Sequence, residues 1–419
     1  MKTPYAYQII HVQLTDGLVL PHESAQLGFY LIFWYNQIPI GHLFIKPGEP
    51  ISTTNLEKRC ISIIQSTLTA YQLNQPDRFS NNYLESTLLP DPNSLQKMLK
   101  HVLERYQPGV FSKYVPITVI ICTRNRPDNL QTCLESLQTM IYQPTEIIVV
   151  DNASTNSYTE KTVRQFKGVT YCREPRPGLD IARNTGILAA HEAIIAYVDD
   201  DVVVHPLWIY QVWETFTDTR VAAMTGLVIA SELTTEAQLI FETHWSFNRG
   251  YIDNYYDSDY FNKTLPSGPP VWEIGAGANM AFRRTLFEEI GYFDERLDVG
   301  AAGCSGDSEL WYRTLSHGHI IHYNPRAIVY HRHRQELAAV KKQLFNYVRG
   351  HTVAALIQQQ QTPQAGYRRY LFITLPAYYF KLLREGFPTF PFRYRTLFAE
   401  IKGFVSGLLF YRKNRLRPS

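Results

Sequence analysis

Three consecutive carboxylates, Asp199, Asp200 and Asp201, interrupt an apolar run in the segment AYVDDDVVVHP. Like charges this close oppose one another's ionisation, and burying them unpaired is costly. Their oxygens suit a hard divalent cation, which proteins hold through one or two carboxylates together with the phosphates of a substrate. The alternative is a solvated strand end or a helix cap before Pro206, because two Asp separated by one residue form a common pattern.

Alternating strands and helices must position these carboxylates. Short β-branched runs predict strands at 117–123, 145–154, 169–173 and 193–201, and amphipathic patterns predict helices at 128–140, 158–166 and 178–193. This alternation predicts a mostly parallel sheet with helices on both faces. Ligands of such sheets bind beyond the carboxyl ends of the strands, and Thr123, Asp151 and Asp199 each fall at such an end.

The segments on either side differ from this central region. Residues 1–75 are predicted to be β-rich, with two apolar strands within Leu27–Ile45 around a turn at Asn36–Pro39. A polar linker with a helix near Ser94–Tyr106 follows. We therefore divide the chain into an N-terminal β-rich region with its linker (1–110), a central α/β domain (111–335) and a basic helical C-terminal region (336–419).

Composition narrows the class of protein. Of the 419 residues, 45% are hydrophobic and 19% are charged, which is typical of a folded globular chain rather than a disordered one. The five cysteines are scattered and form no CxxC pair, which favours reduced thiols over a disulfide framework or a zinc site. The first residues have no apolar signal-peptide core, and no apolar run reaches the length of a membrane span. We expect a cytoplasmic protein.

The charge is unevenly distributed along the chain. His331–Ser419 contains 16 Lys and Arg against 3 Asp and Glu, whereas Met1–Tyr330 is net acidic. Such a basic segment predicts an anionic partner, and its aromatic and aliphatic residues suggest the cytoplasmic face of a membrane. An ordinary basic helical subdomain is the alternative. A nucleic-acid partner is not expected, because no recognition motif accompanies the basic residues.

Six segments give the central region a family resemblance. In chain order they are VPITVIICTRNRPDNLQTCLESL, EIIVVDNAS, PGLDIARNTG, AYVDDDV, GAGANMAFRR and GDSELWYR. Together they resemble the family 2 glycosyltransferases, and the resemblance covers roughly Val115–His333. It implies a GT-A-type fold and inverting transfer of a sugar from a nucleoside-diphosphate sugar to an acceptor hydroxyl. The flanking regions are outside the resemblance.

The resemblance also implies a donor site. In the family, the loop containing Thr123, Arg124 and Arg126 contacts the nucleotide, and the carboxylate at Asp151 accepts a hydrogen bond from a base such as uracil. The remaining donor-binding residues implied are Arg183, Asn184, Asp199, Asp200 and Asn279. The alternatives are solvated surface arginines, a turn cap at Asp151 and a bare helix surface at Arg183.

A Mn²⁺ or Mg²⁺ ion is the cofactor that the resemblance implies. Asp201 is the expected metal ligand, and Asp199 either shares the metal or contacts the ribose. His331, at the end of a late strand in VYHRHR, is expected near the metal or the diphosphate. The alternative is that His331 and His333 are a structural pair.

Asp307 takes the position of the catalytic base in this resemblance. An inverting transfer needs a carboxylate that removes the proton of the acceptor hydroxyl as its oxygen attacks. The family usually has an acidic residue where this chain has Gly306. Asp307 as a helix N-cap is the structural alternative, and Glu309 is the rival base.

The sequence thus predicts a metal-dependent inverting glycosyltransferase with a UDP-linked donor and a glycan or lipid-linked acceptor, acting in surface polysaccharide or glycolipid synthesis. One rival is a sugar nucleotidyltransferase, which is disfavoured because CTRNRPDNL lacks the glycine-rich loop of such enzymes. The other rival is a non-catalytic glycan-binding or scaffolding relative, for which Gly306 is the one indication.

Overall fold

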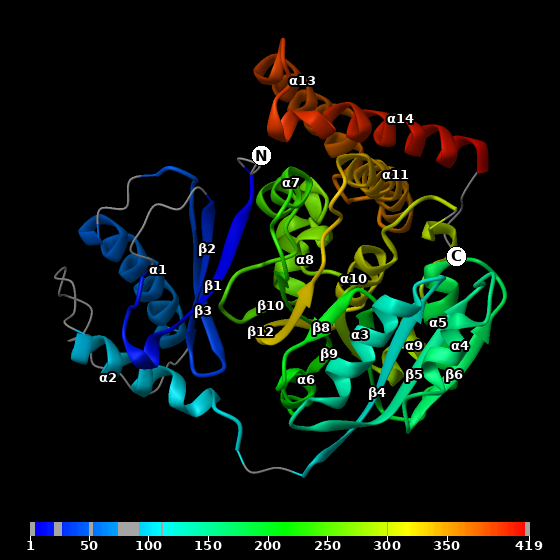
Figure 1. The fold of residues 1–419 in the computed structure, drawn as a ribbon. Helices are drawn as coiled ribbons and strands as arrows, with labels where there is room; N and C mark the ends of the chain where they lie inside the picture. The colour runs from blue at the N-terminus through cyan, green and yellow to red at the C-terminus, as the bar shows by residue number, and fades with distance from the viewer. Residues whose placement is uncertain are drawn as a thin grey trace.

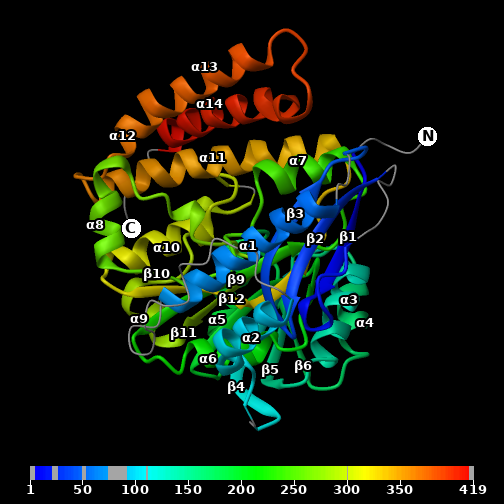
Figure 2. The ribbon, with the colours of Figure 1, turned by 90° about the vertical axis from the view of Figure 1, so that its left-hand side faces the viewer.

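The computed structural model describes residues 5–20, 27–49, 53–73, 92–109, 112–299 and 301–414. Its elements form three groups in chain order: an N-terminal unit, a central sheet with flanking helices, and a set of C-terminal helices (Figure 1). The C-terminal helices lie on one side of the central sheet. The N-terminal unit lies on a different side of the same sheet (Figures 1 and 2).

The central sheet has nine strands in the order β10-β12-β9-β11-β7-β4-β5-β6, with β8 paired to β12. Their bounds are β4 (Tyr114–Thr123), β5 (Gln143–Asn152), β6 (Val169–Glu174), β7 (Ile194–Asp199), β8 (Val202–Val204), β9 (Val221–Ala230), β10 (Asn254–Tyr256), β11 (Asn279–Arg283) and β12 (Ile320–His331). Strands β7, β4, β5 and β6 are mutually parallel, whereas β11 is antiparallel to both neighbours. The predicted α/β architecture is confirmed, with its parallel pairings concentrated in the half that carries the site.

Alternate side chains of the strands pack into two hydrophobic layers. Val119 and Ile121 point into the layer covered by α3 (Pro127–Gln138), α4 (Tyr158–Val163) and α6 (Trp208–Thr215). Ile120 points into the layer covered by α5 (Leu179–Ala189), α9 (Arg284–Ile290) and α10 (Gly306–Ser316). Because both faces are covered, the strands read as continuous apolar runs that end at polar residues on the rim.

The N-terminal unit is a three-stranded sheet covered on one face by helices. Its elements are β1 (Tyr7–Gln13), β2 (Gly28–Tyr35), β3 (Ile38–Ile45), α1 (Thr53–Leu73) and α2 (Pro92–Leu103). All eight residues of β2 are buried, because one face packs on α1 and α2 and the other packs on β9 and β12. The predicted hairpin is confirmed, with its turn at Asn36 and Gln37.

Sequence interpretation missed the longest helix of this unit. It assigned all of residues 1–75 to a β-rich region, but α1 spans Thr53–Leu73. The many Thr and Ile of this segment favour strands by propensity, and packing against β3 overrides that preference. The helix predicted within the linker is present as α2, while residues 74–91 lie outside the described part of the chain.

The C-terminal region is helical, as predicted. Helix α11 (Leu337–Gln361) is followed by α12 (Tyr367–Arg369), α13 (Leu375–Gly386) and α14 (Leu397–Asn414). Helices α13 and α14 lie above α11, on its far side from the sheet (Figure 2). Gly403 and Gly407 let α14 approach α11 closely, because a Cβ at either position would meet the α11 backbone.

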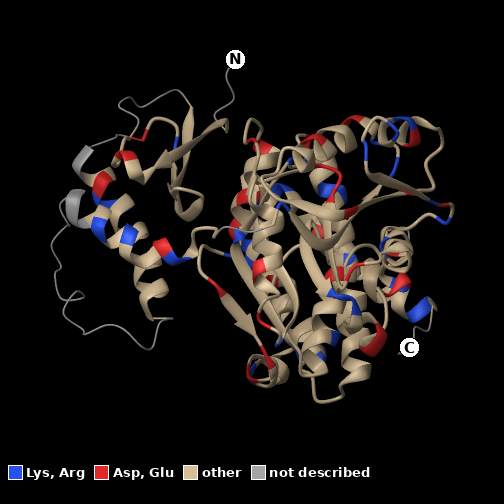
Figure 3. Cartoon of the chain, turned by 90° about the horizontal axis from the view of Figure 1, so that it is seen from below, with Lys and Arg blue, Asp and Glu red and all other residues tan. Residues whose placement is uncertain are grey.

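Within the described residues, no helix combines the length and apolarity needed to cross a bilayer. Seen from below, acidic and basic residues are interspersed along the ribbon (Figure 3).

His205 makes the stability of this fold sensitive to pH. The side chain is 5% exposed, it is stacked on Trp34, and its Nδ1 accepts a hydrogen bond from the Leu207 N–H. Burial, with a smaller contribution from His11, lowers the pKa of His205 from 6.5 to about 4. The pKa of His205 is lower in the folded state than in the unfolded state. The stabilisation that neutral His205 contributes is therefore complete above the unfolded-state pKa and is lost as the pH falls towards the folded-state pKa.

We therefore expect wild type to lose about 2 kcal/mol of unfolding free energy relative to His205→Asn between pH 7 and pH 5. The Asn amide oxygen can accept the same backbone hydrogen bond but does not titrate. Urea denaturation at both pH values measures the difference. Parallel pH dependences of the two proteins would contradict the expectation.

Candidate functional site

Asp200 ties the carboxyl end of β7 to the loop after β4. Its Oδ2 accepts a hydrogen bond from Thr123 Oγ1 at 2.7 Å, and its Oδ1 lies 2.9 Å from Nη1 of Arg126. Burial raises the pKa of Asp200 to about 6, with the charge of Arg126 opposing the shift. Both oxygens of Asp200 are thus engaged by the protein, and the same Arg126 nitrogen also lies 3.2 Å from Oδ2 of Asp201.

Asp199 and Asp201 converge with His331 at this rim. One potential ligand atom from each of the three residues lies within 4.8 Å of the other two. His331 ends β12, and its pairing with Val202 of β8 brings it to the end of β7. One nitrogen and two carboxylate ligands fit a divalent ion such as Mn²⁺ or Mg²⁺. The structure brings together the three residues that the sequence assigned to the metal.

The electrostatics of this cluster show how three adjacent carboxylates are tolerated. Burial raises the pKa of Asp199, and the negative charge of Asp201 adds to the shift. Burial also raises the pKa of Asp201, but His331 and Arg126 outweigh it and the net shift is downward. For His331, burial lowers the pKa, but Asp201 outweighs that effect and raises it. The positive charges of His331 and Arg126 therefore favour the ionised form of Asp201.

Asp151 lies at the end of β5, on the same rim. The side chain is fully buried, and its Oδ2 accepts hydrogen bonds from Tyr171 at 2.6 Å and from Arg173 at 2.8 Å. Its Oδ1 has no hydrogen-bond partner among the described residues. Because a buried unpaired acceptor costs about 1–3 kcal/mol, this oxygen points to a partner outside the protein.

The loops after β4 and β5 are joined by Asn125. This residue has a φ of +55°; its N–H donates to Ser154 Oγ at 2.9 Å, and its Oδ1 accepts from the Thr155 N–H at 2.9 Å. The tie places Arg126 against the acidic cluster and leaves Arg124 exposed. Of the two arginines of this loop that were predicted at the donor site, Arg126 lies at the cluster, whereas Arg124 is exposed.

Helix α5 places a buried cation between the acidic groups. Nη1 of Arg183 lies 2.9 Å from Oδ1 of Asp180, and the nearby charges of Asp180, Asp199 and Asp307 raise the pKa of Arg183 although burial lowers it. Asp298 caps this helix by accepting hydrogen bonds from the N–H groups of residues 179, 180 and 181. Arg183 is thus held where it can interact with both the metal cluster and Asp307.

Asp307 lies in the first turn of α10 and is half-buried. Its Oδ2 accepts a hydrogen bond from the Gly277 N–H at 2.8 Å, and its Oδ1 accepts one from the Ser308 N–H at 2.7 Å. A Cβ at position 277 would press against both Arg183 and Asp307, so a residue without a side chain is needed there. These contacts fix the direction of the Asp307 carboxylate.

Gly306 departs from the family pattern for a local reason. A side chain at this position would collide with the carboxylate of Asp180, which is itself buried and paired with Arg183. An acidic residue at 306 would add a second negative charge against Asp180. The neighbouring Asp180 carboxylate therefore explains the glycine at position 306, and the glycine by itself does not indicate a lost function.

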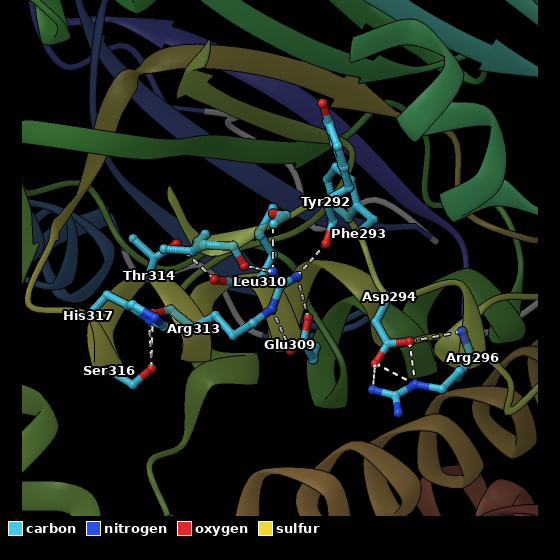
Figure 4. A network of polar contacts seen from close by, with 12 residues as sticks. Tyr292, Phe293, Asp294, Arg296, Glu309, Leu310, Arg313, Thr314, Ser316 and His317 are labelled. Atoms are coloured by element: carbon cyan, nitrogen blue, oxygen red, sulfur yellow. Dashed lines mark hydrogen bonds and ion pairs between the residues drawn. The ribbon is translucent and has the colours of Figure 1, made fainter. Parts of the chain in front are cut away.

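Glu309, the rival base, is fully buried and is paired with Arg313 of the same helix. The two carboxylate oxygens lie 2.6 and 2.7 Å from Nε and Nη2 of Arg313, as Figure 4 shows. Arg313 also donates to the carbonyl oxygens of Ile290, Gly291 and Tyr292. Glu309 therefore holds the end of α9 against α10, and its carboxylate has no exposure from which to accept a proton.

Two of the predicted donor contacts are occupied by protein partners. The Asn279 side chain is fully buried; it accepts a hydrogen bond from Trp208 Nε1 and donates to the carbonyl oxygens of Leu227 and Ala327. The Asn184 amide exchanges two hydrogen bonds with the backbone of Phe293. These asparagines join elements around the site, and their direct contact with a donor remains a prediction.

Several residues at the site carry no sequence signal. Arg173 meets Asp151 because β6 pairs with β5 in that register, which the strand patterns alone do not specify. Glu242 contacts His333 behind His331, and Glu242 comes from α7 (Glu236–His244), outside all six motifs. Only the folded arrangement identifies Arg173 and Glu242, whereas His333 was already visible in VYHRHR.

Comparison with known proteins identifies the domain. The family model described as glycosyl transferase family 2 matches residues 118–291, which contain most of β4 and all of β5–β11. The chain is 28% identical over 191 residues to glycosyltransferase AglE of Haloferax volcanii, covering 44% of this chain and 58% of that protein. It is 25% identical over 224 residues to the pre-mycofactocin glycosyltransferase of Mycobacterium tuberculosis, covering 53% of this chain and 43% of that protein.

Among solved structures, the mannosyltransferase PcManGT from Pyrobaculum calidifontis in complex with GDP-Man and Mn²⁺ matches with a TM-score of 0.45 and 17% identity, covering 84% of this chain and 99% of that chain. The chain spans little more than half the length of two curated relatives that it matches, 58% and 56%. The family model and the curated relatives agree on the central region, and residues 118–291 of the chain are therefore similar to the glycosyl transferase family 2 proteins.

Proposed function

We propose that this protein transfers a sugar from a nucleoside-diphosphate sugar to an acceptor hydroxyl, with inversion at the anomeric carbon and with a divalent metal. The observation that carries the proposal is the convergence of Asp199, Asp201 and His331 at the strand ends, with Arg183 close enough to Asp199 and Asp307 to feel both charges. A potential cation site and a fixed carboxylate near one arginine match the two requirements of the reaction.

Each residue has a task in this proposal. Asp307 accepts the proton of the acceptor hydroxyl, whose oxygen forms the new bond to the anomeric carbon. The bond from that carbon to the diphosphate oxygen breaks, and its electron pair leaves with the diphosphate. Asp199, Asp201 and His331 would hold Mn²⁺ or Mg²⁺, which when bound neutralises charge on the leaving diphosphate. Arg183 remains positively charged throughout.

A uridine nucleotide is the donor that we favour. The free Oδ1 of Asp151 needs a hydrogen-bond donor, and the ring N–H of uracil supplies one. Tyr171 and Arg173 hold the other oxygen and so fix the direction of Oδ1. Cytosine has no equivalent ring N–H, so Asp151 would distinguish between the two pyrimidines.

The stereochemical outcome tests this proposal. Purified protein is incubated with α-linked UDP-sugars and Mn²⁺, and the first sugar product, transferred to acceptor or to water, is followed by proton NMR. We expect a β-configured product that forms only with the metal. An α-configured first product would contradict the assignment of Asp307 as base in a single displacement, and absence of UDP release from every donor would contradict the activity itself.

We further propose that the C-terminal helices contact the cytoplasmic face of an anionic membrane, near a lipid-linked or polymeric glycan acceptor. The support is a set of exposed apolar side chains, here called the outer apolar set: Phe372, Ile373, Phe380, Phe387, Phe398, Val405 and Leu409. Ile373, Phe380 and Phe387 recur every seven residues and are 64%, 68% and 74% exposed. The opposite stripe of α13, which includes Leu375 and Tyr379, is buried against the protein.

Basic residues accompany the outer apolar set. Lys381 and Arg384 lie on α13 with Phe380, and Lys402 and Arg412 lie on α14 with the last three residues of the set. Apolar side chains that enter the headgroup region, flanked by cations that attract anionic lipid, are the features of an interfacial helix. Exposed apolar residues gathered in one region also mark interaction surfaces more often than scattered ones do.

Liposome flotation tests the membrane contact. We expect the wild-type protein to float with phosphatidylglycerol-containing vesicles, and the triple variant Ile373→Ser, Phe380→Ser, Phe387→Ser to bind about tenfold more weakly or worse. The matched control replaces three exposed apolar residues elsewhere, Tyr114, Tyr158 and Leu188, with Ser. Equal recovery of wild type and the triple variant would overturn this part of the proposal.

A further inference from the structure

A line of buried polar side chains runs from His331 away from the acidic cluster. Nδ1 of His331 lies 3.0 Å from Nδ1 of His333, and Nε2 of His333 lies 2.8 Å from Oε2 of Glu242. The three residues are 8%, 3% and 5% exposed, in that order. On the other side of the ring, Nε2 of His331 faces Oδ1 of Asp201 at 3.4 Å.

The order of these contacts determines where the protons lie. A carboxylate only accepts hydrogen bonds, so the nitrogen of His333 that faces Glu242 must carry a proton. A neutral His333 then presents a lone pair at Nδ1. Two lone pairs cannot face each other at hydrogen-bond distance, so Nδ1 of His331 carries the proton between the rings. Nε2 of His331, which faces Asp201, is then the ring nitrogen that gives up any proton it holds when a cation binds.

We propose that Glu242 and His333 are positioning residues that hold His331 as its Nδ1–H tautomer and thereby present its Nε2 to the divalent ion. The inference deepens the proposed function and rests on it for the presence of the metal. It assigns a role to a helix residue outside all six motifs. It also accounts for a second histidine on the same strand end, which the sequence left open between a ligand and a structural pair.

The surroundings of Glu242 favour a fixed arrangement. Its Oε1 accepts hydrogen bonds from Ser246 Oγ at 3.3 Å and from the fully buried Tyr30 hydroxyl at 3.4 Å. Tyr30 belongs to β2, so the N-terminal unit supplies one wall of this enclosure. Phe241 packs against the His333 ring with centroids 4.8 Å apart, and Gln238 Nε2 donates to the His333 carbonyl oxygen.

This enclosure gives the N-terminal unit a connection to the site. Water that reached Glu242 or His333 could donate or accept at either ring nitrogen and would release the tautomer. Little water can reach them, because Glu242 and His333 are buried and Tyr30, which donates to Glu242, lies in the apolar cluster shared with β9 and β12. The proton arrangement is thus a consequence of how two parts of the chain pack together.

The tautomer can be observed directly on the full-length, metal-free protein. Ring nitrogens are labelled with ¹⁵N-histidine, and His331 is assigned by comparison with His331→Asn. We expect a protonated Nδ1 on His331. A bare Nδ1 with a proton only on Nε2 would overturn the proposal. This readout needs neither donor nor turnover, so it is independent of whether the proposed function is correct.

Mn²⁺ titration followed by electron paramagnetic resonance supplies the second test. His333→Phe removes the acceptor for the Nδ1 proton, and we expect it to weaken Mn²⁺ binding by about 10- to 100-fold. His333→Asn places an amide oxygen near the former Nδ1 position and should restore binding to within a few-fold of wild type. Equal affinities for wild type and His333→Phe, with both proteins folded by circular dichroism, would overturn the proposal.

Glu242→Gln separates positioning from general destabilisation. A neutral amide no longer enforces a proton on the facing nitrogen of His333, so Mn²⁺ binding should weaken in the wild-type background. It should have no further effect in the His333→Phe background, because the two residues act in series. Additive losses in the double variant would show that Glu242 acts by another route. If His333→Phe fails to fold, the tautomer measurement on the wild-type chain still decides.

Discussion

Replacing Asp307 with Asn should lower the rate of sugar transfer by about 10²- to 10⁴-fold, because the reaction loses its proton acceptor. The substitution is isosteric, and the amide oxygen can still accept one of the two backbone hydrogen bonds that hold this side chain. We therefore expect UDP to bind with nearly wild-type affinity. Release of UDP from the donor measures the rate, and calorimetry measures the binding.

Glu309→Gln is the matched control on the same helix. Glu309 is fully buried against Arg313, so its replacement should reduce the free energy of unfolding while the folded fraction keeps its activity. If Glu309→Gln abolished transfer in folded protein and Asp307→Asn did not, Glu309 would be the base and our assignment would be wrong. Loss of UDP binding in Asp307→Asn would likewise contradict a role confined to proton transfer.

Asp201→Asn should have the second large effect, on the affinity for metal and nucleotide. The carboxylate lies within the ligand cluster with Asp199 and His331, and the neutral amide is a much poorer ligand for Mn²⁺. We expect metal-dependent UDP binding to weaken by about 100-fold or more. Titration of UDP in the presence of Mn²⁺ provides the measurement.

Asp200→Asn is the internal comparison, one residue away. Asp200 is held by Thr123 and Arg126, so its replacement should disturb the loop after β4 and leave most of the metal affinity. Equal losses of Mn²⁺ affinity in Asp200→Asn and Asp201→Asn would contradict the division of roles within the triple Asp. An unchanged affinity in Asp201→Asn would remove this residue from the metal site.

The sequence was sufficient for the part of the site that lies at strand ends. In a parallel sheet the carboxyl ends of neighbouring strands meet at one edge, so Thr123, Asp151 and Asp199 could be placed on a common rim from strand prediction alone. The pairs β4–β5 and β4–β7 are parallel, as that inference requires. His331 was placed at the metal by resemblance, and its cluster with Asp199 and Asp201 agrees with that placement.

The remainder depends on contacts between segments far apart in the chain. Glu309 and Asp307 lie in the same short motif, so their sequence context does not distinguish them. Arg313, one helical turn after Glu309, pairs with Glu309 and contacts the end of α9, which makes Glu309 the structural residue. Asn279 lies in a small-residue motif, yet its side chain joins three elements of the core. Glu242 has no motif at all, and the packing of α7 against the end of β12 gives it its partner.

Calorimetric titration with UDP, GDP, CDP and dTDP, each with Mn²⁺, with Mg²⁺ and with EDTA, tests the central claim most directly. Our account predicts that UDP binds in the presence of a divalent ion, and that EDTA or Asp201→Asn abolishes the binding. If no nucleoside diphosphate bound, or if UDP bound equally well with EDTA, the metal-dependent donor site proposed for Asp199, Asp201 and His331 would be contradicted.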